Sequence, residues 1–173
     1  IGAQIRADGW GYGCAGNPEL AAEFAYRDAC WTHRANGIYG EMMFAAIIAA
    51  AFSVDDPINL INIGLSEIPE NCKLAEASRR ALSEMDQTKD FYKYMDWVEA
   101  EFGELSGVHT VNNALVVIGA LFYGKSDFHQ SVCYAIEGGW DTDCNGATCG
   151  SILGAIHGRS DMKSSLILSL IHI

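Results

Sequence analysis

Apolar residues recur at intervals of three and four along most of the chain, whereas alternation of apolar and polar residues is nearly absent. The first pattern is typical of amphipathic helices and the second of strands, so the sequence predicts an all-α fold. We expect helices over residues 17–35, 40–54, 58–64, 70–87, 89–105, 108–124 and 126–137, and a last helix that opens near residue 143. Residues 1–16 contain five glycines and are expected to form a loop.

Capping residues mark three of the helix boundaries. Asn17, followed by Pro18, is typical of a helix start, and Asn36 with Gly37 is expected to end the same helix. Ser126 or Asp127 is expected to cap the helix of residues 126–137.

The segment of residues 40–54 is apolar on every side, which places it at the centre of a helical bundle. Glu41 near its beginning is conspicuous, because a buried carboxylate must be paired, bound to a metal or protonated. The alternative is a surface carboxylate in the first turn that stabilises the helix dipole. Polar residues also precede the apolar run of residues 108–124, and one turn of polar side chains is typical of a helix cap.

Asp141 and Asp143 stand two residues apart, after two glycines that permit a tight bend and before the last predicted helix. Two carboxylates on such a loop suit a hard divalent cation such as Mg²⁺, and the helix N-terminus adds N–H groups that favour an anion such as phosphate. The alternative is that one aspartate only caps the helix. Glycines recur every fourth residue from Gly146 to Gly158, so one side of this helix is nearly bare and a neighbour can pack closely.

The composition excludes several function classes. The 173 residues are 50% hydrophobic, which is enough for one domain with a substantial core. A formal net charge of -11 argues against unspecific binding to nucleic acid or to an anionic membrane. The chain has no apolar run of about 18 residues that would suggest a membrane span, and its six cysteines show no CxxC pair or zinc spacing. We therefore predict a cytoplasmic protein without nucleic-acid or membrane partners.

Four segments occur in a characteristic order: GAQIRAD at residues 2–8, GNPELAAEFAYRDACWTH at 16–33, NGIYGEM at 36–42 and GGWDTDCNGAT at 138–148. In this order they resemble the ADP-ribosylglycohydrolase family. The resemblance implies a compact orthogonal helical bundle that hydrolyses an N- or O-glycosidic bond to ribose, commonly releasing ADP-ribose from a modified protein. It also implies a centre of two Mg²⁺ ions, for which Mn²⁺ can substitute.

The resemblance implies roles for individual residues. Asp141 and Asp143 are the expected metal ligands, and Glu41 is the candidate catalytic carboxylate, acting as a base or supporting an oxocarbenium-like centre. Thr32 and His33 match a Thr-His pair that reaches the substrate in the family. The expected substrate-binding residues are Gly2, Arg6, His33 and Tyr39. The polar residues before the apolar run of 108–124 could hydrogen-bond the metal ligands instead of only capping a helix; they are His109, Thr110, Asn112 and Asn113.

The sequence departs from the family pattern in two places. Cys144 stands where the family usually has a metal-contacting Thr or Ser, which leaves the third ligand open between Asn145 and Thr148. The Thr-Asp-Asp segment that supplies the family's other metal ligands is absent, since the only pair of adjacent aspartates, Asp55 and Asp56, stands in a different context. We therefore expect the chain by itself to bind Mg²⁺ weakly and to hydrolyse nothing.

Both ends of the chain suggest a truncated environmental gene fragment. Residues 1–165 are interpreted as the C-terminal portion of a single domain that is incomplete at its N-terminus. Residues 166–173 are interpreted as a non-native tail, because LSLIHI at 168–173 matches a translation of the transposon end used in sequencing libraries. An ordinary apolar C-terminal segment is the alternative.

Two other functions remain open from the sequence. The first is a non-catalytic relative that acts as a structural or ADP-ribose-binding protein, with which Cys144 is consistent. The second is a hydrolase of a free nucleoside or nucleotide-sugar, which would use the same metal chemistry. The motifs do not identify the aglycone.

Overall fold

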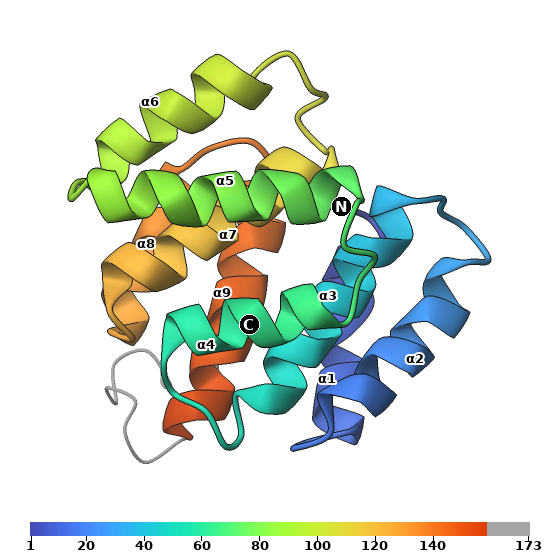
Figure 1. The fold of residues 1–173 in the computed structure, drawn as a ribbon. Coiled ribbons are helices and arrows are strands. Elements are labelled where there is room, and N and C mark those ends of the chain that lie inside the picture. The colour runs from blue at the N-terminus through green and yellow to red at the C-terminus, as the bar shows by residue number, and fades with distance from the viewer. Residues whose placement is uncertain (159–173) are drawn as a thin grey trace.

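Helices α3 (Asn36–Ala50) and α7 (Thr110–Gly124) form the centre of the molecule in the computed structural model, which describes residues 1–158 (Figure 1). Every residue from Met43 to Ala50 is buried, as is every residue from Thr110 to Leu121. The two helices contact each other and are covered by others on their remaining sides. Both helices are apolar on every side over this length, and no side of either one faces water there.

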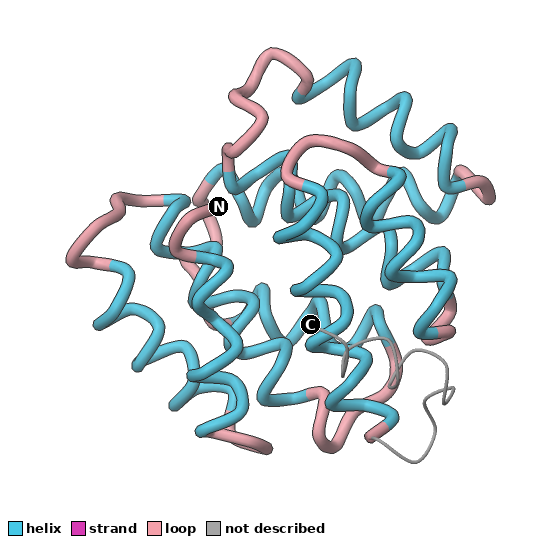
Figure 2. The backbone as a smooth tube through the Cα atoms, turned by 180° about the vertical axis from the view of Figure 1, so that it is seen from behind, coloured by secondary structure: helices cyan, strands magenta, loops and turns pink. Residues whose placement is uncertain are grey.

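The remaining helices surround this central pair. Helices α1, α2 and α4 pack against α3, whereas α5, α6, α8 and α9 pack against α7. Their bounds are Ala7–Gly13 for α1, Pro18–Ala29 for α2, Pro57–Ser66 for α4, Lys73–Gln87 for α5, Phe91–Phe102 for α6, Phe128–Glu137 for α8 and Thr142–His157 for α9, with a short 3-10 helix, η1, at Gln4–Arg6. Figure 2 shows the described residues as helices joined by loops, which confirms the predicted all-α bundle.

Side-chain caps define where several helices begin. Asn17 accepts a hydrogen bond from the backbone N–H of Leu20, and Asp127 accepts one from Gln130, as predicted for α2 and α8. Asp56 and Asp90 cap α4 and α6 in the same way. These caps satisfy backbone donors that the first helical turn leaves without a partner.

The prediction that residues 1–16 form a loop is wrong. They contain η1 and α1, despite the glycines. Gly11 explains the difference, because a Cβ atom built on it would lie 2.5 Å from Cγ2 of Ile48 on α3. The low helix propensity of glycine is outweighed here by close packing of α1 on the central helix, which a larger side chain would prevent.

The predicted boundary between the next two helices is also wrong. Helix α2 ends at Ala29 rather than Ala35, and Asn36 and Gly37 begin α3 instead of ending α2. Ala35, which has a positive φ of 44°, reverses the chain between the two helices. The side chain of Asn36 accepts a hydrogen bond from the backbone N–H of Leu74 at 3.0 Å, so it connects α3 to the beginning of α5.

The glycine row of α9 faces α8. A Cβ atom on Gly146 would lie 3.2 Å from Ile136, and one on Gly150 would lie 3.8 Å from Phe128. The predicted close approach of a neighbour is therefore seen at Gly146, whereas Gly150 has ordinary spacing.

No helix within residues 1–158 combines the length and the apolar character that crossing a membrane requires. The predicted non-native tail, residues 166–173, lies outside the described residues, as does the end of the predicted domain after residue 158.

Candidate active site

Residues 138–143 connect α8 to α9 and include the first two residues of α9. They carry the two aspartates, and we call this segment the DTD loop. Its bend uses left-handed backbone conformations at Gly139, with φ of 80°, and at Trp140, with φ of 53°. Gly138 lies against α7, since a Cβ atom there would be 2.6 Å from Cγ1 of Val116. Glycine at this position therefore allows the loop to approach the central helix closely.

The side chain of Asn113 on α7 holds the DTD loop. Its Oδ1 accepts hydrogen bonds from the backbone N–H of Asp141 at 3.1 Å and from Nδ2 of Asn145 at 2.9 Å. Its Nδ2 donates to the carbonyl oxygens of Gly107 and His109 at 2.9 and 2.8 Å. Because Asn113 is fully buried, these bonds are shielded from water and fix the start of α9 relative to α7.

His109 has the capping role that the sequence offered as an alternative. Its Nδ1 accepts a hydrogen bond from the backbone N–H of Val111 at 3.1 Å at the start of α7. Both interpretations of the polar residues before α7 therefore describe part of the structure, with His109 as cap and Asn113 bonded to the backbone of a candidate metal ligand.

Asp141, Asp143 and Cys144 form a cluster of possible metal ligands. One ligand atom of each lies within 4.8 Å of those of the other two. Asp141 occupies the N-cap position of α9, but its side chain makes no capping hydrogen bond, so capping does not account for its carboxylate. Asn145 and Thr148, the alternative third ligands, are buried, and the amide of Asn145 is bonded to Asn113.

A cavity of about 460 Å³ opens beside this cluster. It brings together predicted site residues from the two ends of the described chain, Gly2 and His33 near one end and Asp141 near the other. We call it the candidate cavity; the residues that line it are Ile1, Gly2, Ile5, His33, Gly37, Val108, His109, Thr110, Asp141 and Cys144.

The N-terminal wall of the candidate cavity is held at two points. The backbone nitrogen of Ile1 donates a hydrogen bond to the carbonyl oxygen of Val108 at 2.8 Å, and Nη1 of Arg6 donates to the carbonyl oxygen of Gly2 at 3.0 Å. A Cβ atom on Gly2 would lie 3.3 Å from Nε2 of His33, so the two residues are direct neighbours in the wall.

Arg6 is bonded to protein groups on several sides rather than pointing freely into the candidate cavity. Its Nε donates to Asp28 at 2.8 Å, and its Nη2 donates to Oγ1 of Thr32 at 3.3 Å. The same Nη2 lies 3.6 Å from the carboxylate of Glu41. Arg6 therefore connects the N-terminal segment to both α2 and α3.

Glu41 lies in the second turn of α3 and is fully buried, which rules out the alternative of a surface carboxylate in a first turn. Burial, together with the nearby Asp28 carboxylate, raises the pKa of Glu41 from its ordinary value near 4.5 to about 8, while the charge of Arg6 acts in the opposite direction. Neither carboxylate oxygen has a hydrogen-bond partner among the described residues. Tyr39, the remaining predicted substrate contact, is half-buried and packs on the hydrophobic core.

A family model described as ADP-ribosylglycohydrolase matches residues 1–171. The chain belongs to the ADP-ribosylglycohydrolase family. No curated protein and no solved structure matches it.

The ligand set of this ADP-ribosylglycohydrolase-type chain fits a divalent cation in part. The oxygen atoms of Asp141 and Asp143 are of the kind that Mg²⁺ binds, whereas a thiol such as that of Cys144 suits softer cations. Burial, with the hydrogen bond and charge of Asp141, raises the pKa of Cys144 to about 11. The thiol is therefore neutral at pH 7. The two carboxylates are therefore the groups that would hold Mg²⁺.

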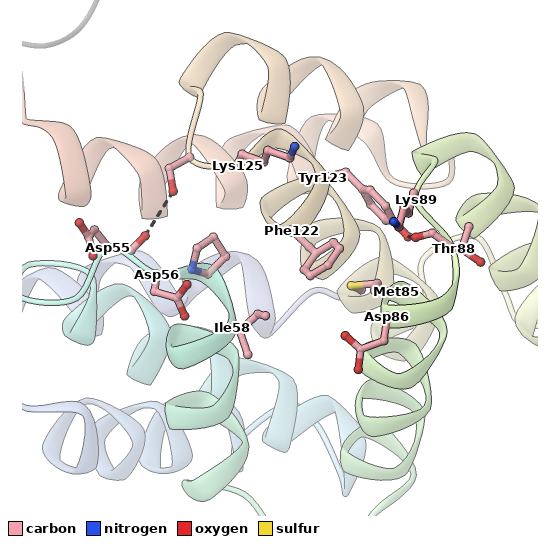
Figure 3. Close-up of a pocket in the computed structure, with 12 residues that line it drawn as sticks. Asp55, Asp56, Ile58, Met85, Asp86, Thr88, Lys89, Phe122, Tyr123 and Lys125 are labelled. Carbon is pink, nitrogen blue, oxygen red and sulfur yellow. Dashed lines mark hydrogen bonds between the residues drawn. The ribbon is translucent and has the colours of Figure 1, made fainter.

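A second cavity is larger but lacks the chemistry expected of an ADP-ribosylglycohydrolase site. It has a volume of about 680 Å³ and lies between the start of α4 and the ends of α5 and α7 (Figure 3). Phe122, Met85 and Ile58 contribute apolar side chains to its lining, and both acidic and basic residues line it as well. None of the predicted site residues belongs to it, so the candidate site is identified by its functional groups and not by its size.

The sequence did not identify Asp28, which binds Arg6 and also accepts a 3.4 Å hydrogen bond from Nε1 of Trp10. The sequence contained no local signal for this role, because Asp28 stands one residue before the end of α2 and its pairing with Arg6 is a contact between separate elements. The pairing depends on the packing of α1 on α2, which a loop over residues 1–16 does not predict.

Proposed function

We propose that this ADP-ribosylglycohydrolase-type hydrolase cleaves, with Mg²⁺, an N- or O-glycosidic bond between ADP-ribose and a modified protein. The supporting observation is the candidate cavity, which combines the carboxylate-bearing DTD loop with the glycine and histidine of the N-terminal wall. A phosphate- and ribose-containing ligand suits this combination, because it needs a cation, hydrogen-bond donors and close approach to backbone.

Asp141 and Asp143 are proposed to hold the cation, with Mn²⁺ as a substitute for Mg²⁺. When bound there, the cation would orient the ribose hydroxyl groups and a water molecule and would offset charge that develops as the bond breaks. Asn113 keeps the DTD loop in place through the backbone of Asp141, so the carboxylates need little rearrangement to bind.

Gly2 and His33 are proposed to contact the ligand in the candidate cavity. The absence of a side chain at Gly2 leaves its backbone open to a ligand, and the imidazole of His33 supplies a polar group in the same wall. Burial lowers the pKa of His33, and the positive charge of Arg6 lowers it further, so the neutral ring is the form that faces a ligand at pH 7.

Glu41 is proposed to act through Arg6 rather than by direct contact with the substrate. Its carboxylate is fully buried, and it forms an ion pair with the guanidinium of Arg6 at 3.6 Å. A carboxyl group with a pKa near 8 in this position can lose or gain a proton within the physiological range, which changes how strongly it attracts Arg6.

The test measures Mg²⁺ binding and release of ADP-ribose from mono-ADP-ribosylated protein, in the chain and in a version extended upstream in the gene. We expect Asp141→Ala combined with Asp143→Ala to abolish both. The matched control is Asp86→Ala combined with Asp96→Ala, which removes the same charge from exposed positions outside the candidate cavity and should leave both unchanged. Release of ADP-ribose that persists without the two carboxylates would contradict the proposal.

Cys144 favours a second candidate function, that of a non-catalytic protein that binds ADP-ribose. A thiol in place of an oxygen ligand weakens the case for a complete Mg²⁺ centre. The same experiment separates the two functions, since a binding protein would retain ADP-ribose without releasing it from a modified protein, whether or not Mg²⁺ is present.

A further inference from the structure

The hydroxyl group of Thr32 lies between a permanent hydrogen-bond donor and an imidazole nitrogen. Nη2 of Arg6 donates to Oγ1 of Thr32 at 3.3 Å, and the same Oγ1 lies 2.8 Å from Nδ1 of His33. These are the two hydrogen bonds of this hydroxyl group among residues 1–158. The three side chains therefore form one chain of hydrogen bonds that ends at the candidate cavity, which His33 lines.

The protons in this chain can be assigned by their chemistry. A guanidinium has no acceptor, so Oγ1 of Thr32 must accept from Arg6. The single hydroxyl proton then has Nδ1 of His33 as its acceptor, and a neutral imidazole whose Nδ1 accepts carries its proton on Nε2. If Nδ1 carried the proton instead, the hydroxyl proton would have no acceptor within the described protein.

The electrostatic setting favours the same assignment. Arg6 places a positive charge on the side of the ring where Nδ1 lies, and a lone pair is more favourable there than an N–H group. Arg6 itself is held by Asp28 at 2.8 Å and by the carbonyl oxygen of Gly2 at 3.0 Å, and Glu41 lies behind it at 3.6 Å. Its donors are therefore directed at protein groups.

We propose that Arg6 and Thr32 are positioning residues that hold His33 in the tautomer protonated on Nε2, so that His33 donates a hydrogen bond to an acceptor oxygen of the ligand. Nε2 lies beside Gly2 in the wall of the candidate cavity, where a Cβ atom on the glycine would be 3.3 Å away. The group opposite His33 in a bound ligand is then a hydrogen-bond acceptor, such as a hydroxyl or phosphate oxygen, and not a protonated amine.

This inference rests on the proposed function in one respect, since it assumes that the candidate cavity receives the ligand. It also changes the role that the family resemblance suggests for Arg6, from contact with the substrate to orientation of a residue that makes contact. The tautomer itself can be measured without any ligand.

The experiment records long-range ¹H–¹⁵N correlations of the histidine rings in the ¹⁵N-labelled protein above about pH 7.5, where neutral rings predominate. Two other histidines serve as internal references. Nδ1 of His109 accepts from a backbone N–H, and Nε2 of His157 lies 2.6 Å from the carbonyl oxygen of Ser126, so both carry the proton on Nε2. We expect His33 to show the same pattern as these two rings, and a proton on Nδ1 of His33 would overturn the proposal.

Two variants of Thr32 directly test whether the hydrogen bonds from Arg6 through Thr32 to His33 set the tautomer. Thr32→Val removes the hydroxyl group at nearly constant volume, and Thr32 is exposed, so the variant should fold. We expect the tautomer ratio of His33 to shift about tenfold towards the form protonated on Nδ1, as for the loss of one ordinary hydrogen bond. Thr32→Ser should restore the wild-type ratio, and the His109 and His157 signals should stay unchanged. An unchanged ratio in Thr32→Val would show that Thr32 does not set the tautomer.

A binding measurement with ADP-ribose separates this proposal from the proposed function. If both hold, Thr32→Val weakens ADP-ribose binding by up to about tenfold and Thr32→Ser does not. If the tautomer depends on Thr32 but the wild-type protein does not bind ADP-ribose, then Thr32 does position His33 and the proposed ligand is wrong. If ADP-ribose binds equally to the wild type and to Thr32→Val, the donor role of His33 towards the ligand is wrong.

Discussion

Asn113 accepts a hydrogen bond at 3.1 Å from the backbone N–H of Asp141, 28 residues further along the chain. The bond joins the buried first turn of α7 to the residue that precedes α9 and carries a candidate metal ligand. The position of the Asp141 carboxylate is therefore set by a side chain in the centre of the bundle and not by the loop alone.

Replacing Asn113 should lower both stability and metal binding. Asn113→Ala leaves the backbone N–H of Asp141 and the amide of Asn145 without their acceptor in a buried place. We expect the free energy of unfolding to fall by about 3 kcal/mol, measured by urea denaturation, and Mg²⁺ binding to weaken in parallel. The control is Asn62→Ala on the exposed side of α4, which should change stability by less than about 0.5 kcal/mol. Equal effects of the two substitutions would contradict the role given to Asn113.

The DTD loop was predictable from sequence, whereas the contacts that support it were only partly so. Two aspartates after paired glycines and before a helix are a local pattern, and the polar residues ahead of α7 were visible as an anomaly. The contact between these polar residues and the DTD loop depends on how α7 packs against α9. Helical periodicity does not specify which helices become neighbours. The network of Arg6 and Asp28 was missed for the same reason.

Two glycines in α1 should respond in opposite ways to alanine. A Cβ atom at Gly11 would be 2.5 Å from Ile48 and 3.2 Å from the carbonyl oxygen of Ala45, so Gly11→Ala should destabilise the protein by about 1–3 kcal/mol. Gly9 lies in the same helix with no other atom within 4 Å of such a Cβ. Gly9→Ala should therefore stabilise the protein by about 0.5–1 kcal/mol.

Thermal unfolding of the two variants checks this prediction, with Gly9→Ala as the matched control. Destabilisation by both substitutions would mean that α1 is not helical at Gly9, and destabilisation by neither would mean that α1 does not pack closely on α3.

The error over α1 shows where composition misleads. Glycine lowers helix propensity, so a glycine-rich segment is interpreted as a loop when its neighbours are unknown. Here buried Ala3 and Ala7 and the close approach at Gly11 make the segment part of the core. By contrast, α4, α5 and α6 were expected within a few residues of their observed bounds, because caps and apolar stripes are local features.

Cys144→Ser should increase affinity for Mg²⁺ relative to softer cations. The substitution replaces sulfur with oxygen next to Asp141 and Asp143, within the ligand cluster. We expect Mg²⁺ to bind at least about threefold more tightly and Cd²⁺ to bind more weakly, measured by isothermal titration calorimetry. Cys133→Ser on α8 provides the control, because this cysteine is outside the cluster. If both variants bind the two cations as the wild type does, the sulfur of Cys144 does not face the cation.

Glu41 should make stability depend on pH in a direction opposite to that of an ordinary surface carboxylate. Its pKa is raised to about 8 in the folded protein by burial and by Asp28, while in the unfolded chain it is near 4.5. The folded state therefore binds more protons between these values, and the free energy of unfolding falls as the pH rises from about 4.5 through 8. The contribution of Glu41 to this slope is at most about 1.4 kcal/mol for each pH unit.

Glu41→Gln removes this titration and keeps a neutral side chain of similar size. We expect the variant to match the wild type near pH 5 and to become progressively more stable than it towards pH 8, in urea denaturation curves measured at each pH. Glu99→Gln, at an exposed position on α6, should follow the wild-type curve throughout. Parallel curves for Glu41→Gln and the wild type would mean that Glu41 is ionised in the folded protein over this whole range, and that its pairing with Arg6 at 3.6 Å outweighs the effect of burial.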